Sequence, residues 1–272
     1  MGQAFIVTKE HRRFIEFANA VRKERTIGIC HGDAGVGKTQ SARRYANWDT
    51  LEPYIDEWGP RSDADDAFYA LANRSRTVFY TPEVLPRPKE LVREIGHWQI
   101  KVDICVEEHQ RTIGNVTGQR SHKNSFVELL IIDEAERLTP MALELLRDQH
   151  DRTHLAIILV GMPGIDQRFR HYPQLYSRLG FSHHYRALGR DELLLVLDRH
   201  WKRIGRTLDP EDFTDAQAIA AIERITRGNF RLLERLFPQI ARILKINQLE
   251  AITDDVVEAA ASILVIGEPS QV

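Results

Sequence analysis

Short apolar runs alternate with amphipathic stretches over most of the chain. Each run consists largely of aliphatic and aromatic residues and is bounded by glycine, proline or a charged side chain. Runs of this kind are typical of strands that are buried on both faces. They lie at Thr26–His31, Thr77–Thr81, Phe126–Asp133, Leu155–Gly161 and Gly180–Ala187. Because these strands alternate with helical stretches, the pattern predicts a parallel sheet that is covered by helices.

The stretches between the strands place apolar residues at helical spacing, and turn residues interrupt them. The clearest start signal is Thr139-Pro140, an N-cap residue followed by proline at the first helical position. Further helices are predicted over Thr8–Arg25, with Thr8 as the N-cap, over Gln40–Asn47 and over Lys89–Val106. The acidic stretch Asp49–Asp66, which contains Pro53, and the glycine-containing stretch His109–Asn124 are both predicted to be loops.

After Gly189 the strand pattern ends and only helical spacing continues. Four helices are predicted, over Asp191–Gly205, Asp215–Thr226, Phe230–Ile246 and Asp254–Leu264, and Thr253 is a good N-cap for the last. The predicted organisation is an N-terminal helix over residues 1–25, an α/β domain over 26–189, a small all-α domain over 190–266 and a tail over 267–272.

Net charge and cysteine content narrow the class of protein. The chain has 37 basic and 39 acidic residues and a net charge of −2, so any binding to nucleic acid depends on a local basic patch. No apolar run approaches the ~20 residues of a membrane span, and the N-terminus lacks the apolar core of a signal peptide. The two cysteines cannot form a disulfide framework or a four-cysteine zinc site. We therefore expect a cytoplasmic protein without a membrane partner.

The segment after the first predicted strand carries the strongest chemical signal. It matches G-x-x-x-x-G-K-[ST] and lies between a strand and a helix, the setting that this phosphate-binding loop requires. Backbone N–H groups and the helix N-terminus would hold the phosphates, Lys38 would reach the β- and γ-phosphates, and the Thr39 hydroxyl would bind Mg²⁺. The predicted nucleotide-binding residues here are Gly32, Asp33, Ala34, Gly35, Val36, Gly37, Lys38, Thr39 and Gln40.

Two carboxylates follow the apolar run Leu129–Ile132 and predict the second half of the same site. Asp133 would join the Mg²⁺ shell, and Glu134 would act as the general base that polarises the attacking water. The sequence has no Asn-Lys-x-Asp motif for reading guanine. We therefore expect ATP rather than GTP as the cofactor, together with Mg²⁺.

A P-loop, an Asp-Glu pair after a strand and an all-helical C-terminal domain together resemble the AAA+ ATPases. The resemblance covers most of the chain and implies a three-layer P-loop fold, with a central parallel sheet followed by a helical lid. It places an arginine finger, which acts on a neighbouring subunit's nucleotide, at Arg178, with Arg168 and Arg170 as alternatives. It places the sensor-2 arginine of the lid at Arg231. Met162 stands where relatives have a polar sensor-1 residue, so slow hydrolysis is expected.

Within the AAA+ ATPases the chain is similar to the TnsC, TniB and MuB group of DNA transposition regulators. The similarity lies in Val78–Pro82, Pro88–Leu91, Leu129–Leu138, Gly161–Ile165 and Gln174–Leu179. It implies a homo-oligomeric ring or helical filament that assembles on duplex DNA with ATP, recruits or activates a transposase, works with a target-selector protein, and disassembles on hydrolysis. The last two stretches also resemble ExeA-type secretion ATPases, which act on protein partners. Replication initiators and helicase loaders are a further alternative.

Local basic residues are the candidates for contacting DNA. The predicted DNA-binding residues are Arg87, Lys89, Arg111, Arg120 and Lys123, and the last three lie in His109–Asn124, a stretch without an acidic residue. Loops of this kind would contact phosphates rather than read bases. An assembly would multiply these contacts along the duplex. The alternative is that both segments are ordinary solvated loops.

Overall fold

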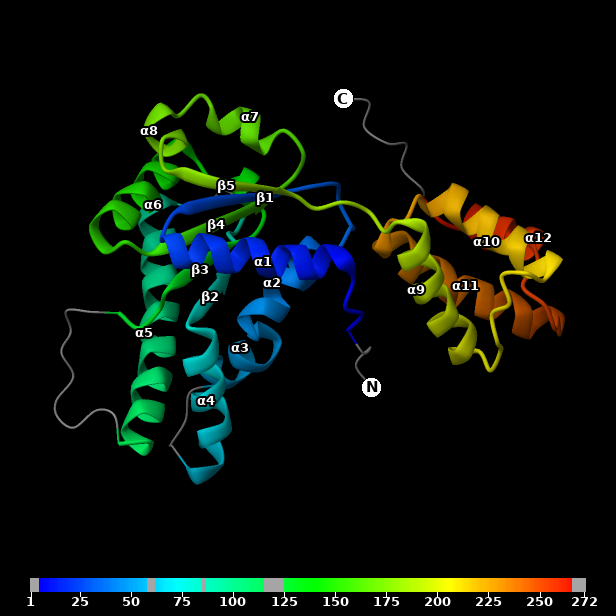
Figure 1. Ribbon diagram of the computed structural model, residues 1–272, viewed down its shortest axis with the longest axis horizontal. Coiled ribbons are helices and arrows are strands. Elements are labelled where there is room, and N and C mark those ends of the chain that lie inside the picture. The colour runs from blue at the N-terminus through cyan, green and yellow to red at the C-terminus, as the bar shows by residue number, and fades with distance from the viewer. Residues whose placement is uncertain (1–4, 58–61, 85–86, 115–124, 266–272) are drawn as a thin grey trace. The chain divides into compact units, whose positions relative to one another are not determined.

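The predicted strands form one parallel sheet in a computed structural model that describes residues 5–57, 62–84, 87–114 and 125–265 (Figure 1). The strands are β1 (Ile27–His31), β2 (Thr77–Tyr80), β3 (Leu129–Ile132), β4 (Ala156–Gly161) and β5 (Leu179–His184). Their order in the sheet is β2-β3-β4-β1-β5, and all neighbouring pairs are parallel. This arrangement confirms the α/β fold that the apolar runs predict.

The chain divides into two compact units. The first, called the sheet unit here, consists of Arg13–Gly32 and Lys38–Tyr185. The second, called the lid unit, consists of Met1–Arg12, Asp33–Gly37 and Arg186–Val272. The division falls within the P-loop and within the first helix, so the predicted boundaries at 25 and 189 stay predictions.

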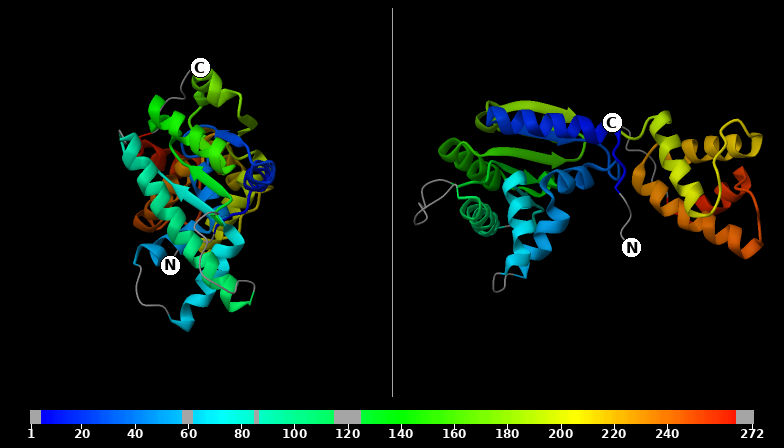
Figure 2. Two further views of the ribbon diagram at one scale, coloured as in Figure 1. Left: turned by 90° about the vertical axis from the view of Figure 1, so that its left-hand side faces the viewer. Right: turned by 60° about the horizontal axis from the view of Figure 1, so that its bottom comes forward.

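Helices cover both faces of the sheet (Figure 2). The helices that precede β5 in the chain are α1 (Lys9–Glu24), α2 (Lys38–Ala46), α3 (Trp48–Asp56), α4 (Asp66–Ser75), α5 (Pro88–Thr112), α6 (Pro140–Thr153), α7 (Ile165–Phe169) and α8 (Pro173–Tyr176), with 3-10 turns η1 (Asp63–Asp65) and η2 (Ala135–Arg137). Helix α1 packs closely on β1, because a Cβ on Gly28 would lie 2.5 Å from the Val21 side chain. Thr8 accepts a hydrogen bond from the His11 N–H, which confirms it as the cap of α1.

The acidic stretch after α2 is not the loop that its composition predicts. Residues 48–56 form α3, and the buried Trp48, Leu51 and Ile55 give this helix an apolar face. Arg43 of α2 bonds both Asp49 and Glu52 at 2.6 Å, so the acidic side chains are neutralised by a neighbouring helix. Charge and proline content alone therefore gave the wrong prediction for the start of this stretch.

Two further predicted boundaries are wrong. Helix α5 continues to Thr112, because polar contacts hold its last turns: Glu107 is buried and bonds Arg111 at 2.7 Å, and Gln110 donates to Asn73 Oδ1 of α4 at 2.8 Å. Strand β3 begins only at Leu129, because the N–H groups of Phe126 and Val127 donate to the Asp103 carboxylate instead of to a neighbouring strand. In both places a tertiary contact decides where the element begins or ends.

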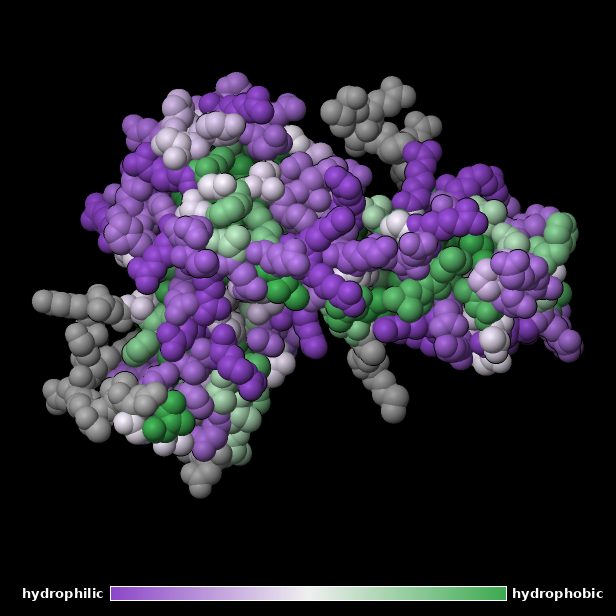
Figure 3. All heavy atoms as spheres, in the orientation of Figure 1, coloured by the Kyte–Doolittle hydropathy of each residue, from purple (hydrophilic) through white to green (hydrophobic). Residues whose placement is uncertain are grey.

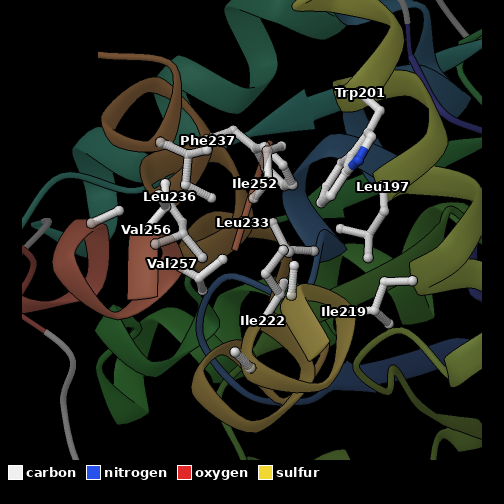
Figure 4. Close-up of a cluster of buried hydrophobic side chains, with 14 of the residues drawn as sticks. Leu197, Trp201, Ile219, Ile222, Leu233, Leu236, Phe237, Ile252, Val256 and Val257 are labelled. Atoms are coloured by element: carbon white, nitrogen blue, oxygen red, sulfur yellow. The ribbon is translucent and has the colours of Figure 1, made fainter. Parts of the chain in front are cut away.

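Four helices form the lid unit's core: α9 (Arg190–Arg203), α10 (Phe213–Thr226), α11 (Phe230–Asn247) and α12 (Asp254–Ser262). Thr253 caps α12 by accepting a bond from Val256 N–H, as predicted. Side chains from all four helices and from the segment before α12 point into one cluster (Figure 4). The labelled members are Leu197, Trp201, Ile219, Ile222, Leu233, Leu236, Phe237, Ile252, Val256 and Val257. Burying such side chains contributes about 1.5–3 kcal/mol each.

The face of the molecule in Figure 3 is mostly hydrophilic, with apolar side chains in smaller groups between charged ones. Among the described helices, none is both long and apolar enough to span a bilayer.

Candidate nucleotide-binding site

The P-loop needs glycine at several positions for reasons that the structure makes explicit. Gly35 and Gly37 have φ angles of 81° and 110°, which L-residues with side chains rarely adopt. The backbone at Gly32 lies close to Tyr185, the residue after β5, since a Cβ on Gly32 would lie 2.1 Å from the Tyr185 carbonyl oxygen. The backbone after β1 is thus free to wind into a loop of N–H groups that can bind an anion.

Helix α2 begins at Lys38, directly after the loop, and holds the predicted phosphate-binding lysine in a buried position. The Lys38 side chain is only 8% exposed, and its Nζ donates to the Gly32 carbonyl oxygen at 2.5 Å. Ser41, one turn later, hydrogen-bonds the Tyr185 hydroxyl at 2.8 Å. These contacts fix the first turn of α2 against the ends of β1 and β5. Val36 is buried, whereas Asp33, Ala34 and Gln40 are exposed.

The two predicted Mg²⁺ ligands meet across the sheet unit. The Thr39 hydroxyl donates to Asp133 Oδ2 at 2.7 Å, although the residues are 94 positions apart in the chain. Asp133 is only 4% exposed, and its N–H donates to the Tyr80 carbonyl oxygen at 2.8 Å. Burial raises the pKa of the Asp133 carboxyl, and the Thr39 hydrogen bond opposes this shift. A hydroxyl and a carboxylate are hard oxygen donors, which suit Mg²⁺.

Glu134 lies beside this pair with an unusual backbone. Its φ and ψ are 48° and 45°, a left-handed conformation that turns the chain sharply out of β3 into η2. Its carboxylate forms an ion pair with Arg137, and Arg137 Nη1 also donates to the Pro82 carbonyl oxygen at 2.7 Å. The strained backbone and the ion pair together set the direction of the Glu134 side chain.

Within the lid unit, the N-terminus of α11 contacts the P-loop backbone. The Asn229 side chain donates to the Ala34 carbonyl oxygen at 2.7 Å and caps α11 by accepting from Leu232 N–H. The Arg231 N–H donates to the Gly35 carbonyl oxygen at 3.0 Å. The predicted sensor-2 arginine is therefore at the P-loop, with an exposed side chain.

The three candidate arginine fingers have different surroundings. Arg178 lies directly before β5, where the sequence places it, and forms a two-point ion pair with Asp151 of α6 at 3.0 and 3.1 Å. Arg168 donates to the carbonyl oxygens of Glu136 and Leu138, both at 2.6 Å, and so holds the turn after Glu134. Arg170 is exposed. The choice of Arg178 as the finger stays a prediction.

Three of the five predicted DNA contacts lie among the described residues, Arg87 and Lys89 at the start of α5 and Arg111 in its last turn. Arg87 is 82% exposed and lies 3.5 Å from Glu90, and Lys89 is exposed on the first turn of α5. Arg111 belongs to α5 and bonds Glu107 at 2.7 Å, so treating it as part of an acid-free loop is wrong. Glu107 and Glu108 lie just before the stretch His109–Asn124, which contains no acidic residue. Arg120 and Lys123 lie outside the described residues.

Sequence reasoning missed three residues that organise these surroundings. Asn229 had a usable signal, because Gly228-Asn229 precedes an apolar helix and asparagine is a strong N-cap. Arg137 had a weaker signal: it is three residues after Glu134, a spacing at which opposite charges can pair. Asp151 had none, because its partner Arg178 is far away in the chain and on another element.

Comparisons with known proteins show the family of the chain. The AAA domain family (AAA_22) matches residues 21–169, which contain the P-loop and the Asp133-Glu134 pair. A protein of Staphylococcus aureus described as "Potential ATP-binding protein" is 40% identical over 274 residues, covering 98% of this chain and 98% of the relative. The chain therefore belongs to the AAA domain family.

Solved structures extend the likeness over both units. The Thermotoga maritima RuvB Holliday junction branch migration motor aligns with a TM-score of 0.56 at 17% identity, covering 96% of this chain and 70% of RuvB. The Aeropyrum pernix ORC2 protein in its ADP form gives 0.55 at 15% identity, covering 96% of this chain and 71% of ORC2. At such identities the likeness concerns the fold, and it confirms the P-loop AAA architecture with a helical C-terminal region.

Proposed function

We propose that the chain is an ATPase that binds ATP with Mg²⁺ through the P-loop and the Asp133-Glu134 pair. The observation that carries this proposal is the 2.7 Å hydrogen bond between Thr39 and Asp133. It brings together the two side chains whose oxygens would hold Mg²⁺, from opposite halves of the sheet unit. When bound, the ion would neutralise charge on the β- and γ-phosphates.

The remaining roles follow from the chemistry of the side chains. Lys38 supplies a buried positive charge to the phosphates at the N-terminus of α2, where the helix dipole also favours an anion. Glu134 takes the proton of the attacking water as general base. Met162 is 39% exposed after β4, and its thioether is a weak acceptor and no donor. It cannot donate to a phosphate, so turnover is slow.

The larger function that we propose is regulation of DNA transposition. In this proposal the ATP-bound chains assemble on duplex target DNA and recruit or activate a transposase, and hydrolysis drives disassembly. The resemblance to the TnsC, TniB and MuB group supports it. The fold likeness to RuvB, a protein described as a Holliday junction branch migration motor, is compatible with DNA as the partner.

Assembly would be head to tail, because an arginine acting on a neighbour's nucleotide needs a heterologous interface. Exposed Arg87 and Lys89 would then repeat along the assembly and contact successive phosphates. Each chain needs only a few such contacts, since their effects add up over many copies.

A duplex-DNA binding assay with a slowly hydrolysed ATP analogue separates this function from its main alternative. The full chain is titrated onto labelled duplex of several sequences, with analogue and Mg²⁺ or without nucleotide. We expect tight binding to every sequence only when the analogue is present. Nucleotide binding without any DNA binding would instead support an ATPase that acts on protein partners, such as the secretion ATPases.

A further inference from the structure

Arg178 is tied to its own subunit by every nitrogen of its side chain. Nε and Nη2 donate to the two carboxylate oxygens of Asp151, at 3.0 and 3.1 Å. Nη1 donates to the Gln174 carbonyl oxygen at 3.1 Å and to the Ser177 hydroxyl at 2.8 Å. A guanidinium has five N–H groups in a fixed fork, so a two-point carboxylate bond uses the face that would otherwise bind a phosphate.

The backbone that carries Arg178 is firmly held, so only its side chain is able to change partner. The Arg178 carbonyl oxygen accepts from Ile27 N–H at 3.2 Å and from the Thr26 hydroxyl at 2.8 Å, where β1 begins. The side chains of Arg178 and Asp151 are 36% and 30% exposed. A partner that approaches from solvent can therefore reach the pair.

Asp151 would not be left unpaired if Arg178 turned away. Arg147, one turn earlier on α6, also forms an ion pair with Asp151. Arg147 in turn bonds Glu144 at 2.8 Å. Removing one partner of an ion pair is expensive when the other charge is left unsatisfied. Here both the bonded and the released arrangement leave Asp151 with a cation, so release loses one ion pair without leaving a bare charge.

We propose that Asp151 holds Arg178 within the free subunit and gives it up to the nucleotide phosphates of a second copy of this chain during assembly. This inference rests on the proposed function, because it takes ATP-dependent self-assembly as given. Asp151 is then a positioning residue that competes in cis with the neighbouring subunit's phosphate. The competition raises the protein concentration at which the chains assemble.

Substituting Asp151→Asn tests the competition, and Asp148→Asn is the matched control. Asp148 lies on the same helix and pairs with Arg152 at 2.9 Å, so the control makes the same chemical change without touching Arg178. Self-association of the full chain is followed by sedimentation velocity over a concentration series, with a slowly hydrolysed ATP analogue and Mg²⁺. A partly exposed ion pair contributes little to an equilibrium, so the expected shift is about fivefold.

The expected result is an association midpoint about fivefold lower for Asp151→Asn and unchanged for Asp148→Asn. The shift should vanish in an Arg178→Ala background, because the competing group is gone. A merely structural role for Asp151 predicts the opposite direction, with a higher midpoint and a lower Tm. A midpoint that is equal to or above that of Asp148→Asn overturns the inference and leaves the proposed function standing. A wild-type chain that never self-associates with the analogue contradicts both.

Discussion

The nucleotide site and the predicted DNA-binding segments are built in different ways. Lys38 and Asp133 are buried; Lys38 bonds the first residue of the P-loop, and Asp133 bonds Thr39 from another element. Among the described residues, Arg87 and Arg111 pair with acids of α5 that are one turn away, and Arg87 is largely exposed. The first site is formed by one folded chain. In the proposed assembly the second set of side chains would gain strength through repetition, so the two sets should respond very differently to single substitutions.

The largest effect is expected from Glu134→Gln, which removes the base and keeps the shape of the side chain. Single-turnover ATP hydrolysis should fall by about 10²- to 10⁴-fold, the usual contribution of a general base. Binding of a fluorescent ATP analogue should stay within a factor of about 2. Glu136→Gln, two residues away and exposed, is the control and should hydrolyse ATP normally. Unchanged turnover in Glu134→Gln would remove this residue from the role.

Lys38→Ala should weaken binding of the ATP analogue by about fiftyfold. The lost contacts are charge-assisted hydrogen bonds to phosphate, each of which contributes about 1.5–3 kcal/mol. Lys245→Ala removes an exposed lysine of α11 and should bind the analogue like the wild type. Equal affinity in Lys38→Ala would mean that the loop does not hold the phosphates.

Removing charges from the predicted DNA-binding segments should have a smaller effect than the two substitutions above. The effect should appear in how the affinity for DNA depends on salt concentration. The double substitution Arg87→Ala with Lys89→Ala should flatten the slope of log affinity against log salt by about 1.8, or 0.9 per lost contact. Arg111→Ala should change it less, because Glu107 already neutralises that charge. The same measurement on the double substitution Arg120→Ala with Lys123→Ala covers the two predicted contacts that lie outside the described residues. Identical slopes for all variants, measured by fluorescence anisotropy, would show that these are solvated side chains.

The smallest expected effect is a gain in stability. The folded-state pKa of Asp133 is raised by burial, so ionised Asp133 costs stability at neutral pH, and this cost disappears as the pH falls through the raised pKa. Asp133→Asn should therefore raise Tm at pH 7 by about 2–4 °C, which corresponds to about 1 kcal/mol. The difference should shrink toward acidic pH. A lower Tm at pH 7 would mean that the Thr39 hydrogen bond outweighs the cost of burial.

The sequence predicted the parts of the fold that local patterns determine. The five strands, the cap at Thr139 and the loop before Lys38 all depend on neighbouring residues, and the structure has all of them, although β3 begins at Leu129 rather than Phe126 and β5 ends at His184 rather than Ala187. The pairing of Thr39 with Asp133 was also predictable, because parallel strands bring their carboxyl ends to one edge of a sheet.

Contacts between residues on different elements could not be predicted from the sequence. The acids of α3 looked like a solvated loop because Arg43, which neutralises them, lies on another helix. The predicted third strand was too long because Asp103 takes its first N–H groups. Arg178 was found from its motif, but its partner Asp151 was not. In each case, tertiary packing brings together groups that no spacing rule connects.

Thermodynamic linkage offers the most direct test of the central claim, that ATP binding and DNA binding belong to one switch. If the nucleotide raises the affinity for DNA, duplex DNA must raise the affinity for the nucleotide by the same factor. The measurement is the affinity of the wild-type chain for a fluorescent, slowly hydrolysed ATP analogue, with and without saturating duplex. The account predicts a clear gain with DNA, equal to the gain in DNA affinity that the analogue produces. An analogue affinity that is the same with and without DNA would contradict it.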